Sequence, residues 1–149
     1  MGSAEEWARS LKASIDAKHA ESNRAMERVA MNRNIVAEQM PVIWDGLLAE
    51  FANCCKAFNE QIKPERELAL HRTGSHDFMV RPDAMEEIVR GHYFYDLHHI
   101  SIITKRGTEL FVPGVSHVGT GKVFLVSSIT QSETSLESIA RNAIMGFAL

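Results

Sequence analysis

Histidine is the residue type with the greatest chemical potential in this 149-residue chain, which holds seven of them. Four lie between residues 92 and 117. A hairpin turning at Arg106-Gly107, with Thr104 opposite Glu109, would set Asp96 opposite His117 and make His98 its diagonal neighbour. Two imidazoles and one carboxylate on a single sheet face are the ligand set of a non-haem iron or catalytic zinc centre.

The same three residues support two other interpretations. Asp96 could orient His117 for proton transfer in an acid-base enzyme. Alternatively, Asp96 and His117 could form only a cross-strand hydrogen bond at a sheet edge. Pro113 interrupts the partner strand, and one bulged residue there would move His117 to the opposite face. We therefore name Asp96, His98 and His117 as a candidate ligand or metal site, with an unknown cofactor of which a divalent metal is one option.

Other catalytic and cofactor signatures are absent from the sequence. There is no HExxH, GxSxG or EF-hand pattern, and the glycines at 119 and 121 complete neither phosphate-binding motif. The two cysteines, Cys54 and Cys55, are adjacent, so they can form neither a CxxC site nor a disulfide framework. Both fall on an apolar helical stripe, which favours buried, reduced thiols.

The charge distribution bears on partners and location. The chain has 16 basic and 19 acidic residues, and neither its first 63 residues nor the remainder is net cationic, so nucleic acid is not an expected partner. No segment is long and apolar enough for a membrane-spanning helix. Glu5 and Glu6 argue against a secretory signal, and we expect a cytoplasmic location.

Residues 1–63 have the pattern of a helical segment. After Pro41 the apolar residues recur every three or four positions. This stripe consists of Ile43, Trp44, Leu47, Leu48, Phe51, Cys54, Cys55, Phe58 and Ile62. Proline suits the first turn of a helix, so we expect a kink or break at 40–41.

Residues 4–39 are less regular and form either one long helix or two that part near Ser22-Asn23. Trp7, Leu11 and Ile15 lie at helical spacing on a segment with little else to bury. We name these three residues as a candidate interface with a second copy of the chain. The alternative is that the segment packs back on its own sheet.

Residues 64–131 have the texture of an antiparallel meander of about five strands. The expected strands span 67–72, 77–81, 92–104, 109–118 and 122–129, and glycine-containing turns separate several of them. Between Pro82 and Gly91, Asp83 and Glu86 suit a single helical turn, although a strand at 86–90 fits as well. In the strand at 92–104, Tyr93, Tyr95 and Leu97 share one face, which we expect to pack beneath a helix.

Residues 132–149 should form a C-terminal helix that packs on the sheet. Thr134 to Glu137 matches a capping box, and apolar residues follow at helical spacing. The predicted fold is thus a single α+β domain over 1–149. It consists of an N-terminal long helix or helix pair, the meander and this helix.

The functional expectation is a class rather than an activity. We expect a small cytoplasmic, non-catalytic interaction or ligand-binding module that self-associates as a homodimer, with a small-molecule or protein ligand as a further partner. We expect neither nucleic acid nor membrane as a partner. The alternative is a metal-dependent or His/Asp acid-base enzyme at Asp96, His98 and His117.

Overall fold

The computed structural model describes residues 3–82, 87–116 and 121–148. The chain divides into two compact units, Met1–Asn34 and Ile35–Leu149. Helix α1, Ala4–Ile62, begins in the first unit and ends in the second. A seven-stranded antiparallel sheet and a C-terminal helix follow, so the predicted α+β class is confirmed with more strands than the expected five.

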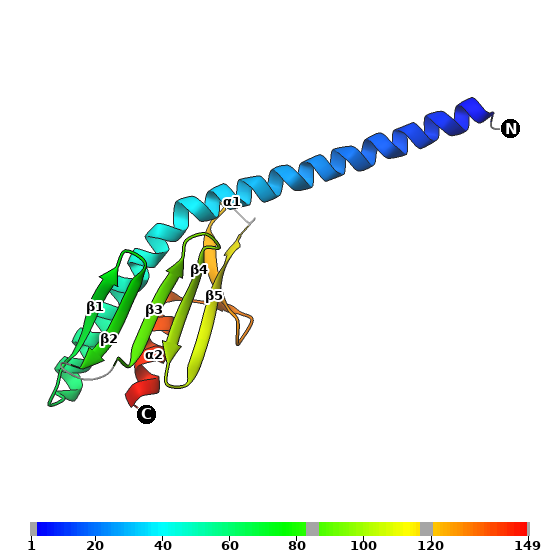
Figure 1. Cartoon of the computed structure of the whole chain (residues 1–149). Coiled ribbons are helices and arrows are strands. Elements are labelled where there is room, and N and C mark those ends of the chain that lie inside the picture. Colours follow the sequence, from blue (N-terminus) through cyan, green and yellow to red (C-terminus); the bar gives the residue numbers. More distant parts are fainter. Residues whose placement is uncertain (1–2, 83–86, 117–120, 149) are drawn as a thin grey trace. The chain divides into compact units, whose positions relative to one another are not determined.

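The sheet is a simple meander in which each strand pairs with the next along the chain (Figure 1). The strands are β1 Leu68–Gly74, β2 Asp77–Pro82, β3 Val89–Phe94, β4 His99–Thr104, β5 Gly107–Val115, β6 Val123–Ser127 and β7 Glu133–Thr134. Helix α2 spans Leu136–Ala148. The short strand β7 was not expected from the sequence. The helical turn expected from Asp83 and Glu86 lies outside the described residues. Of the alternative strand at 86–90, only the last two of the described residues are strand, because β3 begins at Val89.

Of the kink or break expected at residues 40–41, the break is wrong, because α1 runs through Pro41 as one continuous helix. Proline has no N–H, so it cannot donate to the carbonyl of Ala37. Packing offsets this loss, since Met40, Trp44 and Leu47 are all buried in the core on either side of Pro41. The question of one or two helices over 4–39 is thereby answered as one.

The first unit contains the N-terminal half of α1, and none of the side chains described in it, from Ser3 to Asn34, is buried. Every residue from Ser3 to Met31 is exposed. An isolated helix gains little stability from intrinsic propensity, because most helical stability in proteins comes from burying an apolar face. This half of α1 therefore lacks the packing that normally holds such a helix.

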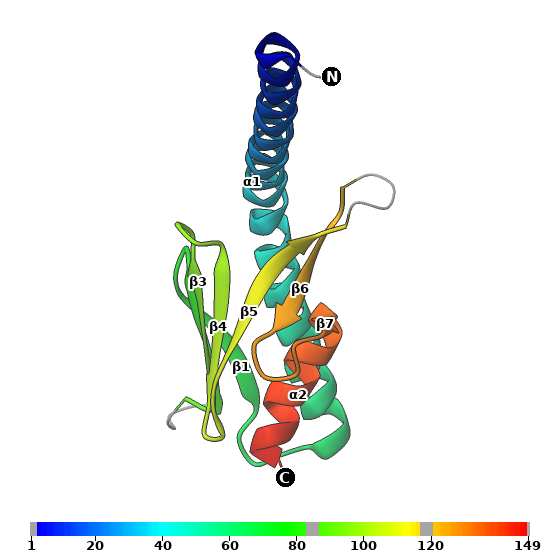
Figure 2. The same cartoon turned by 90° about the vertical axis from the view of Figure 1, so that its right-hand side faces the viewer.

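In the second unit, the remainder of α1 and helix α2 both lie against one face of the sheet (Figure 2). Alternate strand residues point into this layer, as the burial pattern of β2 shows with Phe78 and Val80 inward. From the helices, Phe51 and Ile144 meet them in the same core. The opposite face of the sheet carries partly exposed apolar side chains such as Phe94.

The segment 92–104 is a hairpin and not the single strand we expected. Strand β3 ends at Phe94, a turn covers 95–98, and β4 begins at His99. The next register also differs, because Thr104 pairs with Gly107 and not with Glu109. The shift is two residues, so residues of β4 and β5 that were expected to share a face still share one. The inward face of β4 is not the expected one, because Ile100 pairs with the buried Tyr93 and is itself buried, whereas one continuous strand with Tyr93 inward would also turn Ile103 inward.

The N-terminus of α2 is capped one residue later than the sequence suggested. The Ser135 hydroxyl accepts the Ser138 N–H at 3.1 Å, and the Ser135 carbonyl accepts the Ile139 N–H. Ser135 is therefore the N-cap, in place of Thr134 of the predicted capping box. Thr134 belongs instead to β7, where it pairs with Leu125.

Two amide side chains join α1 to the sheet. Asn59 donates to the carbonyl of Leu68 at 2.9 Å and accepts the N–H of the same residue at 2.8 Å. Gln39 likewise donates to the Gly121 carbonyl at 3.0 Å and accepts the Val123 N–H at 2.9 Å. Each amide satisfies backbone groups where a strand begins, which fixes the helix along its length against β1 and β6.

No helix in the parts of the chain that the structure describes is long and apolar enough to cross a membrane.

Candidate functional site

Aromatic and imidazole rings gather at the end of the sheet where the β1–β2 and β3–β4 turns lie. They line a hollow of about 330 Å³. We call this hollow the aromatic pocket, and it is lined by Pro41, Trp44, Asp45, Ser75, His76, Tyr93, Tyr95 and His98. Its residues come from α1, from β3 and from both turns, all within the second unit.

The innermost rings of the pocket are Trp44 and Tyr93. Their centroids lie 5.7 Å apart with planes 27° from parallel, and both side chains are buried. Trp44 also packs on Phe78 of the core at 5.4 Å. The pocket therefore has a rigid base that is continuous with the hydrophobic core.

Three further rings surround this base. His76 lies 5.6 Å from Tyr93 and 5.2 Å from Tyr95, measured between ring centroids. His98 lies 6.0 Å from Tyr93 on the same measure. Tyr95 is 66% exposed, so it forms the outer rim of the pocket.

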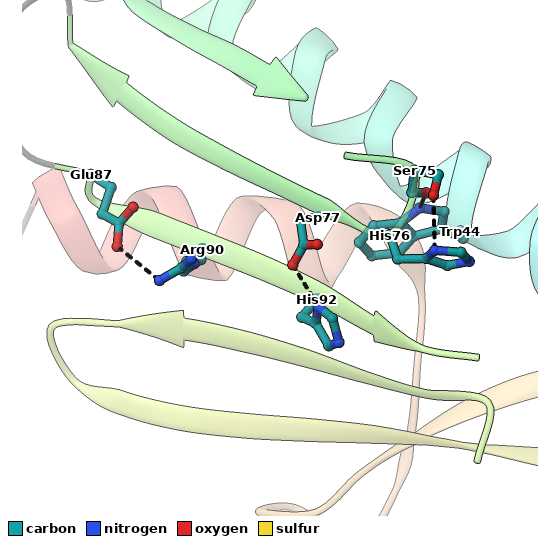
Figure 3. A network of polar contacts seen from close by, with 7 residues as sticks. All are labelled: Trp44, Ser75, His76, Asp77, Glu87, Arg90 and His92. Atoms are coloured by element: carbon teal, nitrogen blue, oxygen red, sulfur yellow. Dashed lines mark hydrogen bonds and ion pairs between the residues drawn. The ribbon is translucent and has the colours of Figure 1, made fainter. Parts of the chain in front are cut away.

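Hydrogen bonds fix the orientation of these rings (Figure 3). The Trp44 indole N–H donates to the Ser75 carbonyl at 3.3 Å. The Ser75 hydroxyl lies 3.0 Å from His76 Nδ1, and the Tyr93 hydroxyl lies 2.5 Å from His98 Nδ1. Burial raises the pKa of Tyr93, so its hydroxyl keeps its proton at neutral pH.

One carboxylate belongs to the pocket lining, that of Asp45 on α1. It lies 3.7 Å from the guanidinium of Arg72, and its side chain is 71% exposed. A single exposed ion pair of this kind contributes little free energy because water screens both charges. Asp45 thus remains accessible to a competing cation.

A second polar pair, Asp77 and His92, lies on the opposite face of the sheet (Figure 3). The two residues are direct cross-strand partners, and Asp77 Oδ1 lies 2.5 Å from His92 Nδ1. The His92 ring also meets Phe94 edge-on at 4.3 Å. Both members of the pair are more than a third exposed, so it contributes little to stability on its own.

The structure separates the residues named from the sequence as a metal site. Asp96 lies in the β3–β4 turn, where its carboxylate accepts the Leu97 N–H at 3.1 Å, so it cannot be the strand partner we expected. His98 lies in the same turn and belongs to the aromatic pocket. His117 lies outside the described residues, so the metal prediction stays untested. Within 3–82, 87–116 and 121–148, no three His, Cys, Asp or Glu residues could hold a metal ion.

Sequence reasoning missed the pocket because it placed the two tyrosines on one strand face. Tyr93 is indeed buried beneath α1, but Tyr95 and Leu97 lie in the turn and are exposed, so that part of the prediction is wrong. His76 lies in the β1–β2 turn, where a polar residue by itself does not indicate a site. The available signal was the density of aromatic and histidine residues near both turns.

Neither thiol has the features of a reactive cysteine. Cys54 and Cys55 are free, and Cys55 is buried in the core. Burial raises the pKa of the Cys55 thiol to about 11 and, with the nearby Glu50, also raises that of Cys54. Thiolates are the reactive species, so both cysteines should be inert at neutral pH.

A larger hollow of about 660 Å³ lies between α1, β6 and the start of α2, lined in part by Ile43, Phe124 and Leu136. Most of its lining is apolar, and its charged members are only Lys122 and Glu133. No hydrogen-bonded cluster of aromatic or imidazole rings faces it among the described residues. This hollow is the larger candidate ligand site, whereas the aromatic pocket has the more specific set of side chains.

The predicted interface residues are all exposed in the first unit. Trp7 is 67% exposed, and both Leu11 and Ile15 are 44% exposed. Met26 and Val29, on the same half of α1, are also exposed. These apolar side chains form a second candidate functional surface.

Comparison with known proteins finds no matching family model, no similar curated protein and no similar solved structure.

Proposed function

We propose that this protein is a non-catalytic interaction module that works as a homodimer, with residues 4–34 as the pairing element. The observation that carries this proposal is the fully exposed N-terminal half of α1, which presents large apolar side chains to water. Full burial of one such side chain stabilises by roughly 1.5 to 3 kcal/mol. A partner helix would supply the packing that this half of α1 lacks.

Five of the exposed apolar residues form one stripe along the helix, whereas Met31 lies on the opposite face. At 3.6 residues per turn, the positions of Trp7, Leu11, Ile15, Met26 and Val29 fall within an arc of about 100°. An arc of that width is what a helix buries against one partner. We call these residues the N-terminal stripe.

Polar residues within the same arc determine which orientation of a partner helix is favourable. Lys18, Ser22 and Arg33 occupy the positions that continue the stripe. A parallel pair of identical helices would set Lys18 against its own copy at the seam, and like charges in contact are unfavourable. A second copy in antiparallel orientation removes this repulsion, because Lys18 then faces Ser22.

An antiparallel register centred on Ala20 also matches the apolar residues. In this register Leu11 of one copy faces Val29 of the other, and Ile15 faces Ala25, one position from Met26. Trp7 then meets Arg33, a pairing that adds cation–π attraction of roughly 0.5 to 1 kcal/mol at an exposed site. The stripe is therefore complementary to itself when reversed, which is the requirement for a two-fold symmetric dimer.

Sedimentation equilibrium of the full chain over a range of concentrations tests this proposal. We expect the mass of a dimer for the parent and of a monomer for Leu11→Glu at the same concentration, because a buried unpaired charge is costly. The matched control is Ala13→Glu, which adds the same charge on the opposite face of the same helix. A monomeric parent, or equal dissociation of both variants, would overturn the proposal.

A further inference from the structure

We propose that the aromatic pocket binds a small organic cation of the methylated or quaternary ammonium class. This inference goes beyond self-association and concerns a different unit of the protein. It stands on three features of the pocket: its ring faces, its occupied hydrogen-bonding groups and its single carboxylate.

The first feature is the density of aromatic faces. Trp44, Tyr93 and Tyr95 each carry a negative ring face, which attracts a cation within about 6 Å of the ring centroid. His76 links the two tyrosines, at 5.6 and 5.2 Å between centroids. A ligand in the hollow would therefore contact several rings at once. This is how aromatic cages recognise ammonium groups whose protons are replaced by methyls.

The second feature is that the polar groups at the base are already paired with one another. The Trp44 N–H is bound to the Ser75 carbonyl, and the Tyr93 hydroxyl is bound to His98. A ligand that needed these groups would have to break existing hydrogen bonds, which is costly for buried groups. A methylated ammonium needs no hydrogen bond, so it fits a site whose internal bonds are complete.

The third feature is the carboxylate of Asp45. It lines the pocket and supplies the one formal negative charge there. Its existing partner, Arg72, lies 3.7 Å away in an exposed ion pair. A bound cation would compete with that guanidinium at little cost. A neutral aromatic ligand would gain nothing from this carboxylate.

The volume limits the ligand to a small one. About 330 Å³ is near the lower end of the range for small-molecule sites, which is roughly 300 to 1,000 Å³. The rim at Tyr95 is exposed. The pocket thus suits a compact cationic head group, either free or at the end of a longer chain that leaves past Tyr95.

Tryptophan fluorescence offers a direct test with the full chain. In a Trp7→Phe background, Trp44 is the one remaining tryptophan. We expect titration with tetramethylammonium chloride to change its emission saturably. Sodium chloride controls for ionic strength, and tert-butanol controls for a neutral group of similar shape. No saturable response, or an equal response to tert-butanol, would overturn the proposal.

Substitutions at exposed positions test the contributions of the Tyr95 ring and the Asp45 carboxylate to binding without disturbing the core. We expect Tyr95→Ala to weaken tetramethylammonium binding by roughly 2- to 30-fold, the range that one cation–π contact spans, and Tyr95→Phe to retain it. Asp45→Asn should weaken binding, whereas Glu60→Gln, a matched change on an exposed part of α1, should not. Unchanged affinity in both Tyr95→Ala and Asp45→Asn would place the ligand elsewhere and contradict this assignment.

Discussion

The ring of Phe78 occupies the space that a side chain on its cross-strand partner Gly91 would fill. A Cβ placed on Gly91 would lie 2.0 Å from Cε1 of Phe78 and within 3 Å of two further ring atoms. The ring also packs on Phe51 at 4.8 Å and on Trp44 at 5.4 Å. The absence of a side chain at Gly91 therefore positions the base of the aromatic pocket.

Gly91→Ala should destabilise the protein, because the Phe78 ring in this space is fully buried and packs on Phe51 and Trp44. Overpacking of a core costs about 1 to 3 kcal/mol, and we expect a loss in the free energy of unfolding of at least that size by chemical denaturation. Gly74→Ala is the control, since its Cβ would lie 3.6 Å from the nearest atom. Equal stability of the two variants would contradict this packing.

Asn59→Ala should weaken the attachment of α1 to β1. The change removes both hydrogen bonds to Leu68 and leaves that residue's N–H and carbonyl without their partner. We expect a loss of about 1 to 3 kcal/mol in the free energy of unfolding. Gln61→Ala, an exposed amide two residues along the same helix, should change stability by less than about 0.5 kcal/mol. An equal free energy of unfolding in the two variants would contradict a stabilising role for the Asn59 hydrogen bonds.

The cysteines make stability fall at high pH. Burial raises the pKa of Cys55 to about 11 in the folded state from its ordinary value of 9.0, so the unfolded chain loses this proton first. As pH rises from about 9 toward 11, ionisation therefore favours the unfolded state. We expect the free energy of unfolding to decline over that interval and to decline less steeply in Cys55→Ala.

The raised pKa of Cys55 should also slow the reaction of its thiol with alkylating reagents. At pH 8 a thiol with a pKa of about 11 carries roughly a hundredth of the thiolate of a thiol with the ordinary pKa of 9.0. We expect alkylation of native Cys55 to be correspondingly slower than that of the unfolded chain. Rapid labelling of Cys55 in the native protein would show that it is not buried.

Periodicity made the helices and the meander predictable. The stripe from Trp44 to Phe51 and the alternation along β2 indicate which residues are buried, and the structure confirms both.

 The break expected at Pro41 does not occur, because local preference is outweighed by the burial of Met40 and Trp44 on either side.

The candidate site could not be assembled from the sequence because one turn carries no glycine or proline. His98 adopts a φ of 56°, a conformation in which glycine or asparagine is expected. With no such signal, residues 92–104 have the pattern of one strand. Gly107, with a φ of 128°, begins β5 and lies one position beyond the two-residue turn at Lys105 and Arg106. These two turns account for the displaced histidines and the changed register.

The self-pairing of the N-terminal half of α1 is the central claim, and its register can be measured by disulfide cross-linking. In a chain with Cys54→Ala and Cys55→Ala, one sample carries Leu11→Cys and the other Val29→Cys. A disulfide requires Cβ atoms about 3.5 to 4.5 Å apart. On mixing and oxidation, we predict the 11–29 cross-link in clear excess over 11–11 and 29–29. Dominant 11–11 and 29–29 products would indicate a parallel pair, and the absence of any cross-link would contradict pairing through this helix.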